Sequence, residues 1–363
     1  MYILAFETSC DDTSIAIFRD SELLAMDTKS QIKEHLPTCW VVPEVAARLH
    51  ANNIFSVLET VLQKSWIRLE EIDYIACTEQ PWLQPSLYVG LTVARTLSKL
   101  LGKPLLPINH IQAHIFANLL ERKVEEVIFP TICLTVSGWH NEIYILKSLF
   151  EMELIGQTQD DSAWEAFDKV AKMMWLWFPG WPVISRFASE YSWSFKWIFP
   201  RVLLEKWSLD FSFSWIKSAV KREIDRRIKE NKKSNIESSF TEISNIESWV
   251  WDILPEKLKY SQDIEEVNKY LSHDDKLEIA FEFQETVIDI LTTKLFLAAE
   301  RFSINSLALA GWVSANEALK SKISKLANEK GYTFIHPIKP VYSQDNAAMV
   351  GILAYYKIIS QIS

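Results

Sequence analysis

The chain has 363 residues, of which 48% are hydrophobic and 23% are charged, and this size predicts two domains or one large duplicated domain. Its formal net charge of −9 argues against non-specific nucleic-acid binding by the whole surface, but it leaves room for a local basic patch or an RNA-binding partner. The N-terminus lacks a basic region and no run of about 18 apolar residues occurs, so we expect neither a signal peptide nor a membrane span.

Two parts of the chain follow one plan, in which three strands lead into helices. Residues 2–30 are predicted to form a strand meander, followed by a helix at 43–65, a strand at 73–78 and a helix at 86–101. Residues 131–158 repeat the meander, and a helix at 279–302, a strand at 306–311 and a helix at 314–330 come later. We therefore predict a duplicated α/β fold with a central cleft, with an N-terminal half at 1–129 and a C-terminal half at 130–363.

A charged, partly repetitive segment at 221–275 interrupts the second half, and we expect a helical or mobile surface insertion there without a catalytic role. Basic residues gather at its front end: Lys217, Lys221, Arg222, Arg226, Arg227, Lys229, Lys232 and Lys233. A solvated helix face is one interpretation of this cluster, and a patch that contacts phosphates is the other.

The string HIQAH at 110–114 places two histidines four residues apart. On a helix, His110 and His114 share one face and can bind one metal ion. No glutamate follows His110, so this is not the motif of zinc proteases. Asp345, beside a predicted helix start, is the candidate third ligand, with an N-cap or turn aspartate as the alternative. Two histidines and one carboxylate favour Fe(II), with zinc as the alternative, and leave positions open for substrate.

Three strand-to-turn segments are suited to hold a nucleotide: TVSGWH at 135–140, FPGWP at 178–182 and AGWVSAN at 310–316. Their backbone N–H groups are candidates to bind phosphate, base or ribose. Carboxylates lie near the same predicted cleft, namely Glu7, Asp11 and Asp12 in the first hairpin and Asp168 in a helix. They are candidates to hold a ribose hydroxyl, to orient a nucleophile or to act through a metal, although exposed carboxylates are usually only solvated.

Tryptophan is abundant in this chain and glycine is scarce, with 15 Trp against 8 Gly. An ordinary chain of this length contains roughly 25 glycines, and many of these Trp residues fall in turn contexts where glycine is favoured. We interpret them as glycine codons translated as Trp, with UGA as the candidate codon. A genuinely tryptophan-rich core is the alternative.

Taken in chain order, the motifs resemble one family, the tRNA N6-adenosine threonylcarbamoyltransferases of the bacterial TsaD type, formerly called O-sialoglycoprotein endopeptidases. The strings that carry the resemblance include ETSCDDTS, VVPEVAARLH, NHIQAH, VSGWH, EAFDKVAK, FPGWP, AGWVSAN and QDNAAM. The family pattern has glycine at several of the tryptophans, namely Trp40, Trp82, Trp139, Trp164, Trp175, Trp177, Trp181, Trp215 and Trp312, and also at Gln80.

The resemblance implies an actin/sugar-kinase/Hsp70-like (ASKHA) fold. It also implies transfer of a threonylcarbamoyl group from threonylcarbamoyl-AMP to N6 of the adenine 3′ to the anticodon, in tRNAs that read codons beginning with A. The implied metal ligands are His110, His114 and Asp345, for one divalent ion per subunit. The implied donor-binding residues are Thr135, Val136, Ser137, Gly138, Trp139, Asp168, Trp181 and Asn316.

The resemblance further implies tRNA as substrate and a complex with a paralogous subunit and a small ATPase. Two alternatives remain, a non-catalytic scaffold of the same complex and another ASKHA enzyme such as a kinase or a carbamoyltransferase. The paired histidines argue against both, since a scaffold needs no metal ligands and kinases of this fold need carboxylates for magnesium. The four cysteines, which lack CxxC spacing, are typical of reduced thiols in a cytoplasmic protein.

Overall fold

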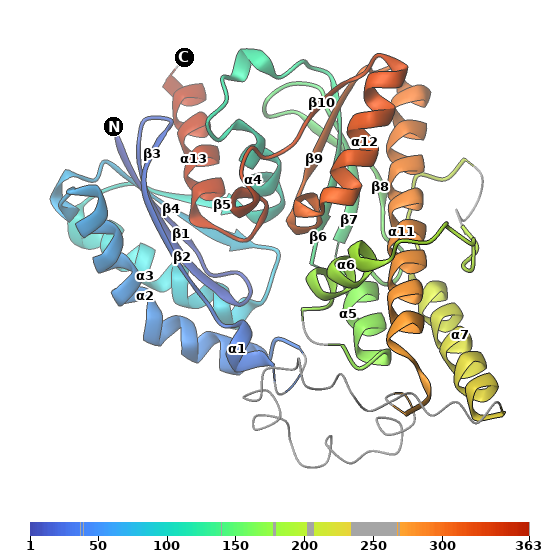
Figure 1. Ribbon diagram of the computed structural model, residues 1–363. Helices are drawn as coiled ribbons and strands as arrows, with labels where there is room; N and C mark the ends of the chain where they lie inside the picture. The colour runs from blue at the N-terminus through green and yellow to red at the C-terminus, as the bar shows by residue number, and fades with distance from the viewer. Residues whose placement is uncertain are drawn as a thin grey trace.

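Two five-stranded sheets of the same construction form the centre of this computed structural model (Figure 1). The structure describes the chain except residues 37, 39, 139, 177–178, 202–206, 234–266, 268 and 363. The first sheet has the order β3-β2-β1-β4-β5. Its strands are β1 (Tyr2–Glu7), β2 (Asp12–Arg19), β3 (Glu22–Ser30), β4 (Tyr74–Gln80) and β5 (Leu105–Asn109). The first three strands are antiparallel, whereas β1 pairs in parallel with β4 and β4 with β5.

The second sheet repeats this pattern. Its strands are β6 (Thr131–Ser137), β7 (His140–Leu146), β8 (Met152–Gln157), β9 (Ser306–Ala310) and β10 (Thr333–Ile335), in the order β10-β9-β6-β7-β8. Here too the first three strands form an antiparallel meander, and the first of them, β6, pairs in parallel with the fourth. The predicted duplicated ASKHA-type α/β fold is therefore confirmed.

Helices cover both faces of the first sheet. Along β1, Leu4 and Phe6 pack against α2 (Pro43–Ser65) and α3 (Gln84–Leu101). The alternate residues Ile3 and Ala5 point the other way, toward α4 (His110–Phe116) and α13 (Ala347–Ile362). α13 packs on this sheet although it is the last helix of the chain (Figure 1). The boundary between residues 129 and 130 stays a prediction. α13 belongs to the C-terminal half by sequence, but it packs on the sheet of the N-terminal half.

The second sheet carries the larger core, on the face covered by the remaining long helices. These are α5 (Ala163–Met173), α6 (Gly180–Glu190), α7 (Ser214–Lys233), α11 (His273–Phe302) and α12 (Glu317–Lys330). Short helices complete the described chain: α1 (Ile32–His35), η1 (Leu69–Glu71), η2 (Ala117–Leu119), η3 (Val124–Glu126), η5 (Trp312–Ala315) and η6 (Pro340–Ser343). On the opposite face, Ile115 of α4 packs against Cys133 and Ala308, so the two halves meet beside α4.

The charged segment at 221–275 begins as a continuation of α7, and most of its remainder lies outside the described residues. Arg227 is buried and forms ion pairs with Glu223, Asp275 and Glu278, so it does not belong to an exposed basic face. Arg226 likewise pairs with acidic neighbours on its own helix. These pairings favour a charge-balanced helix over a phosphate-binding patch. Among the described residues, no helix has the length and apolar character needed to cross a bilayer.

Candidate active site

Two histidines project from one side of α4. The strand β5 ends at Asn109. The side-chain oxygen of Asn109 accepts a hydrogen bond from the backbone N–H of Gln112 and caps the helix. His110 and His114 lie four residues apart on this helix and therefore share a face. Both side chains are buried. The sequence thus presents two imidazoles side by side, as the spacing predicted.

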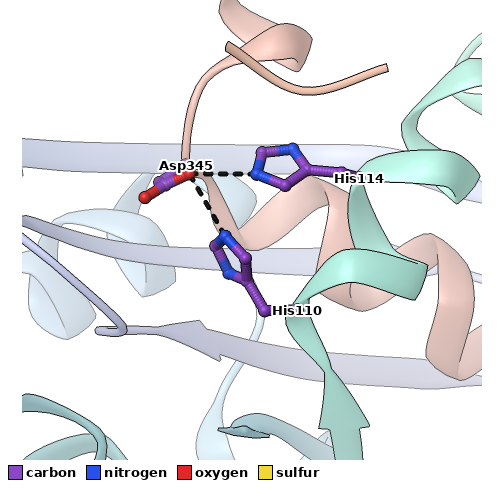
Figure 2. A group of neighbouring side chains, drawn as sticks. All are labelled: His110, His114 and Asp345. Atoms are coloured by element: carbon purple, nitrogen blue, oxygen red, sulfur yellow. Dashed lines mark hydrogen bonds and ion pairs between the residues drawn. The ribbon is translucent and has the colours of Figure 1, made fainter. Parts of the chain in front are cut away.

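Asp345 reaches the histidines from the turn before α13. Its Oδ1 lies 3.1 Å from Nε2 of His114 and 3.5 Å from Nε2 of His110 (Figure 2). The three ligand atoms lie within 4.8 Å of one another. Ligands about 2.0–2.2 Å from one tetrahedral zinc ion lie roughly 3.3 Å apart. The Asp345 oxygen lies at about this distance from both nitrogens, so the predicted group can bind one divalent ion after a small adjustment of the side chains.

The charges in this group are coupled. Burial lowers the pKa of His110, but the carboxylates of Asp345 and Glu7 outweigh burial and raise that pKa to about 10. Burial also opposes ionisation of Asp345, yet contact with His110 holds the pKa of this carboxyl below its usual range. Burial and the charge on His110 together lower the pKa of His114. A metal ion at this site would displace a proton from His110 and take its place beside Asp345.

A pocket of about 140 Å³ opens onto His110 and Asp345. Both halves of the chain line it: Cys10, Asp11, Ile32, Trp40, Val41, Trp82 and His110 from the first, and Ser137, Gly138, Trp164, Asp168, Pro179, Trp312 and Asp345 from the second. The pocket therefore lies in the predicted cleft between the halves. Candidate metal ligands and candidate nucleotide-binding turns both line it.

Two backbone turns of the pocket are held by α5. Ser162 caps this helix, and its hydroxyl donates a 2.6 Å hydrogen bond to the carbonyl of Gly138. Asp168, further along the helix, accepts a 2.6 Å hydrogen bond from the backbone N–H of Gly180. Burial raises the pKa of Asp168 to about 7. The first turn follows β6 and the second begins α6, so α5 fixes the backbone on two sides of the pocket.

The profile of a family described as tRNA N6-adenosine threonylcarbamoyltransferase, TsaD, matches residues 22–352. A protein of that name from Porphyromonas gingivalis is 40% identical over 359 residues, which cover 98% of this chain and 93% of the relative. One from Kosmotoga olearia is 36% identical over 358 residues, with the same two coverages. The chain belongs to the TsaD family.

A solved structure extends the comparison to the fold alone. HypF from T. kodakarensis matches with a TM-score of 0.53 at 12% identity, over 99% of this chain and 48% of that one. The similarity spans both halves of the TsaD-family chain, which agrees with the repeated sheet order.

The three acidic residues of the first hairpin occupy different places in the TsaD-family site. Asp11 lines the pocket, where burial and the nearby Asp345 raise its pKa to about 6. Glu7 is fully buried behind His110, at the end of β1. Asp12 is also buried, and burial with the charge of Asp11 raises its pKa well above the usual range. The catalytic roles assigned to these three side chains stay predictions.

The predicted donor-binding residues divide between the pocket wall and the structure behind it. Ser137, Gly138 and Asp168 line the pocket. Four others lie outside the lining: Thr135 and Val136 are buried within β6, Trp181 lies in α6 with its ring 6.3 Å from that of Trp164, and Asn316 caps α12. The Asn316 amide donates to Ser185 and Gln284. Trp139 falls outside the described residues. These roles too stay predictions.

Sequence reasoning did not assign four further lining residues, Cys10, Ile32, Val41 and Pro179. Val41 and Pro179 belong to motifs that carry the family resemblance, and that was the available signal. Ile32 begins the short helix α1, and no sequence motif marks it as a pocket residue. Its place in the pocket wall depends on how the segment between β3 and α2 folds.

Indole rings fill much of the pocket wall. Trp40, Trp82, Trp164 and Trp312 all line it, and the rings of Trp164 and Trp312 are 5.5 Å apart. Nε1 of Trp312 donates a 2.8 Å hydrogen bond to Oδ1 of Asp345, the same atom that faces both histidines. These are four of the positions at which the resemblance predicts glycine, and that stays a prediction.

Proposed function

We propose that this chain transfers a threonylcarbamoyl group from threonylcarbamoyl-AMP to N6 of the adenine 3′ to the anticodon, in tRNAs that read codons beginning with A. The observation that carries the proposal is the meeting of a buried His–His–Asp group with a pocket lined by both halves of a chain of the TsaD family. The paired histidines favour this enzyme over a scaffold or a kinase of the same fold.

The pocket residues divide the work as follows. The turn at Ser137 and Gly138 holds the donor phosphate through backbone N–H groups, and Asp168 accepts from a donor hydroxyl. The adenine N6 attacks the carbamoyl carbonyl carbon, the carbon–oxygen bond to phosphate breaks, and AMP leaves. Asp11, a carboxyl of pKa about 6 on the pocket wall, accepts the proton that the amine loses.

His110, His114 and Asp345 hold one divalent metal ion per subunit, with Fe(II) as the first candidate and zinc as the second. When bound, this ion supplies Lewis-acid polarisation of the transferred carbonyl and orients the donor. Metal analysis of the protein purified without oxygen distinguishes the two ions. A preparation that is fully active and metal-free would exclude both.

The substrate and partners follow from the same reaction. A chain of net charge −9 has little attraction for tRNA over its whole surface, so we propose that a paralogous subunit and a small ATPase assist docking. The reaction takes place where tRNA is processed, and we propose a cytoplasmic location. The described cysteines, Cys10, Cys77 and Cys133, are all free thiols, in keeping with that compartment.

The test is reconstitution with threonylcarbamoyl-AMP and an unmodified tRNA that reads a codon beginning with A. Digestion to nucleosides and mass spectrometry detects the modified adenosine. We expect product from the chain that carries glycine at the predicted family glycine positions, together with its partners, and none from the chain with tryptophan there. His114→Ala or Asp345→Ala in the glycine chain is also expected to give no product. Product formation by those variants would refute the role of the metal ligands, and the absence of product in every combination of partners would refute the proposed activity.

We also propose that the tryptophans at family glycine positions are glycine in the organism, through UGA codons read as Gly. Among the described residues, six that are not glycine have positive φ, and three of them are tryptophan. Trp175 is one of the predicted family glycine positions, whereas Trp66 and Trp197 are further tryptophans in the same backbone conformation. A bulky side chain in this region is strained by about 1–2 kcal/mol, whereas glycine is not. The indoles that narrow the pocket add a second, independent support. The gene sequence tests the idea: in-frame UGA at these positions supports it, and UGG throughout refutes it.

A further inference from the structure

His110 has a second ring nitrogen, which faces away from Asp345 and toward the end of β1. Its Nδ1 lies 3.1 Å from Oε2 of Glu7 and 3.1 Å from the hydroxyl of Ser9. Glu7 is 0% exposed and His110 is 1% exposed, so no solvent competes for this contact. The imidazole is therefore held between two carboxylates, one on the ligand side and one behind.

The Glu7 carboxylate is itself held on both oxygens. Its Oε1 accepts a 2.6 Å hydrogen bond from the backbone N–H of Ser9, and its Oε2 accepts a 2.6 Å hydrogen bond from the hydroxyl of Thr78 at the end of β4. Because β1 and β4 are paired strands of the first sheet, these donors belong to the rigid part of the fold. The carboxylate cannot turn without losing one of them.

Only a carboxylate satisfies the three donors that converge here. The Ser9 N–H, the Thr78 O–H and the Nδ1–H of His110 each need an oxygen lone pair. A glutamine in place of Glu7 has one oxygen and an NH2 group, so at least one donor would face another donor. His114 lacks a comparable arrangement, since in the described part of the chain its Nδ1 has no hydrogen-bond partner.

We propose that Glu7 is a positioning residue for the metal ligand His110, which it fixes in the tautomer and orientation that direct the Nε2 lone pair toward His114 and Asp345. A carboxylate behind a ligating imidazole also makes that imidazole a stronger metal ligand. Glu7 then acts through His110 and does not touch the substrate, in contrast to Asp11, which lines the pocket. This inference rests on the metal-dependent function proposed above.

The experiment measures the Kd of Co(II) for the full chain by its visible absorption, in competition with a chelator of known affinity. We expect Glu7→Gln to bind Co(II) about 10- to 100-fold more weakly than the parent. The matched control is Glu282→Gln, which alters an equally buried carboxylate in the other half, where Glu282 accepts from the backbone N–H groups of Lys196 and Ile198. The control is expected to lose stability and to keep the parent Kd.

A second pair of variants covers the case in which Glu7→Gln does not fold. Thr78→Val removes one hydrogen bond to the Glu7 carboxylate and keeps the shape of the side chain, and Thr78→Ser keeps the hydroxyl. We expect a smaller loss of Co(II) affinity in the first and the parent affinity in the second. A folded Glu7→Gln or Thr78→Val with the parent Kd would overturn the proposal, as would a loss in Glu282→Gln equal to that in Glu7→Gln.

The failure of this inference is distinguishable from the failure of the proposed function. If the parent and His114→Ala bind Co(II) equally weakly, the metal site is absent and the role of Glu7 falls with it. If the parent binds Co(II) tightly, Glu7→Gln does not, and no tRNA product forms, the positioning role stands and the proposed reaction is wrong.

Discussion

Replacing Trp312 tests whether an indole competes with metal at this site. Its Nε1 donates a 2.8 Å hydrogen bond to Oδ1 of Asp345, the oxygen that faces both histidines. A hydrogen bond to a charged group is worth about 1.5–3 kcal/mol, and every 1.4 kcal/mol is a factor of about ten in affinity. Trp312→Phe removes the donor and keeps an aromatic ring. We therefore expect it to increase the affinity for a divalent ion by about 10- to 100-fold.

The assay is a Co(II) titration of the parent, Trp312→Phe and Trp312→Gly under identical buffer conditions. Trp164→Phe is the control, because Trp164 lines the same pocket but its indole hydrogen-bonds to Asp168 and not to a metal ligand. We expect tighter binding in both Trp312 variants and no change in the control. If Trp312→Phe binds Co(II) no more tightly than the parent, the indole leaves Oδ1 available and the reasoning is refuted.

Three further predictions concern stability. Trp66→Gly relieves the strain of a left-handed residue at the end of α2 and is expected to raise the free energy of unfolding by about 1 kcal/mol in urea titrations. Trp193→Gly, at another largely exposed tryptophan but without positive φ, is expected to show no gain. Burial raises the pKa of Asp168 from 3.8 to about 7, so the folded chain holds its proton more tightly than the unfolded chain and loses stability as pH rises from about 4 to 7. Asp168→Asn, compared by unfolding at several pH values, should show a smaller decline, since Asp11 and Asp12 also have raised pKa values and keep their contributions. An unchanged decline would contradict the assignment. Co(II) at 100 times its Kd is expected to stabilise the parent by about 2.7 kcal/mol and to leave His114→Ala unaffected, as measured by unfolding with and without a chelator.

The parts of the site that could be predicted from sequence are those fixed by local periodicity. His110 and His114 share a helix face whatever surrounds them, and the strand meanders follow the alternation of apolar residues. Asp345 could be proposed as a metal ligand from its motif. Its contact with His114, which lies 231 positions away in the chain, depends on the packing of α13 on the first sheet. Glu7 was predicted to lie near the cleft. Its place behind His110 follows from the pairing of β1 with β4, which no local pattern reveals.

The exposure of the tryptophans bears on the two interpretations of their abundance and favours the proposed recoding. A tryptophan-rich core requires buried indoles, yet among the described residues no tryptophan is fully buried. Four are partly buried and pack against the core of the second half: Trp164, Trp175, Trp181 and Trp215. Five are largely exposed: Trp40 at 62%, Trp66 at 90%, Trp193 at 74%, Trp197 at 66% and Trp207 at 65%. An indole carries roughly 150–250 Å² of surface that stabilises a protein only when it is removed from water. Selection for a core does not account for side chains left in solvent at turns. The proposed recoding of glycine codons would account for indoles in turns, at positive φ and in the wall of a ligand pocket.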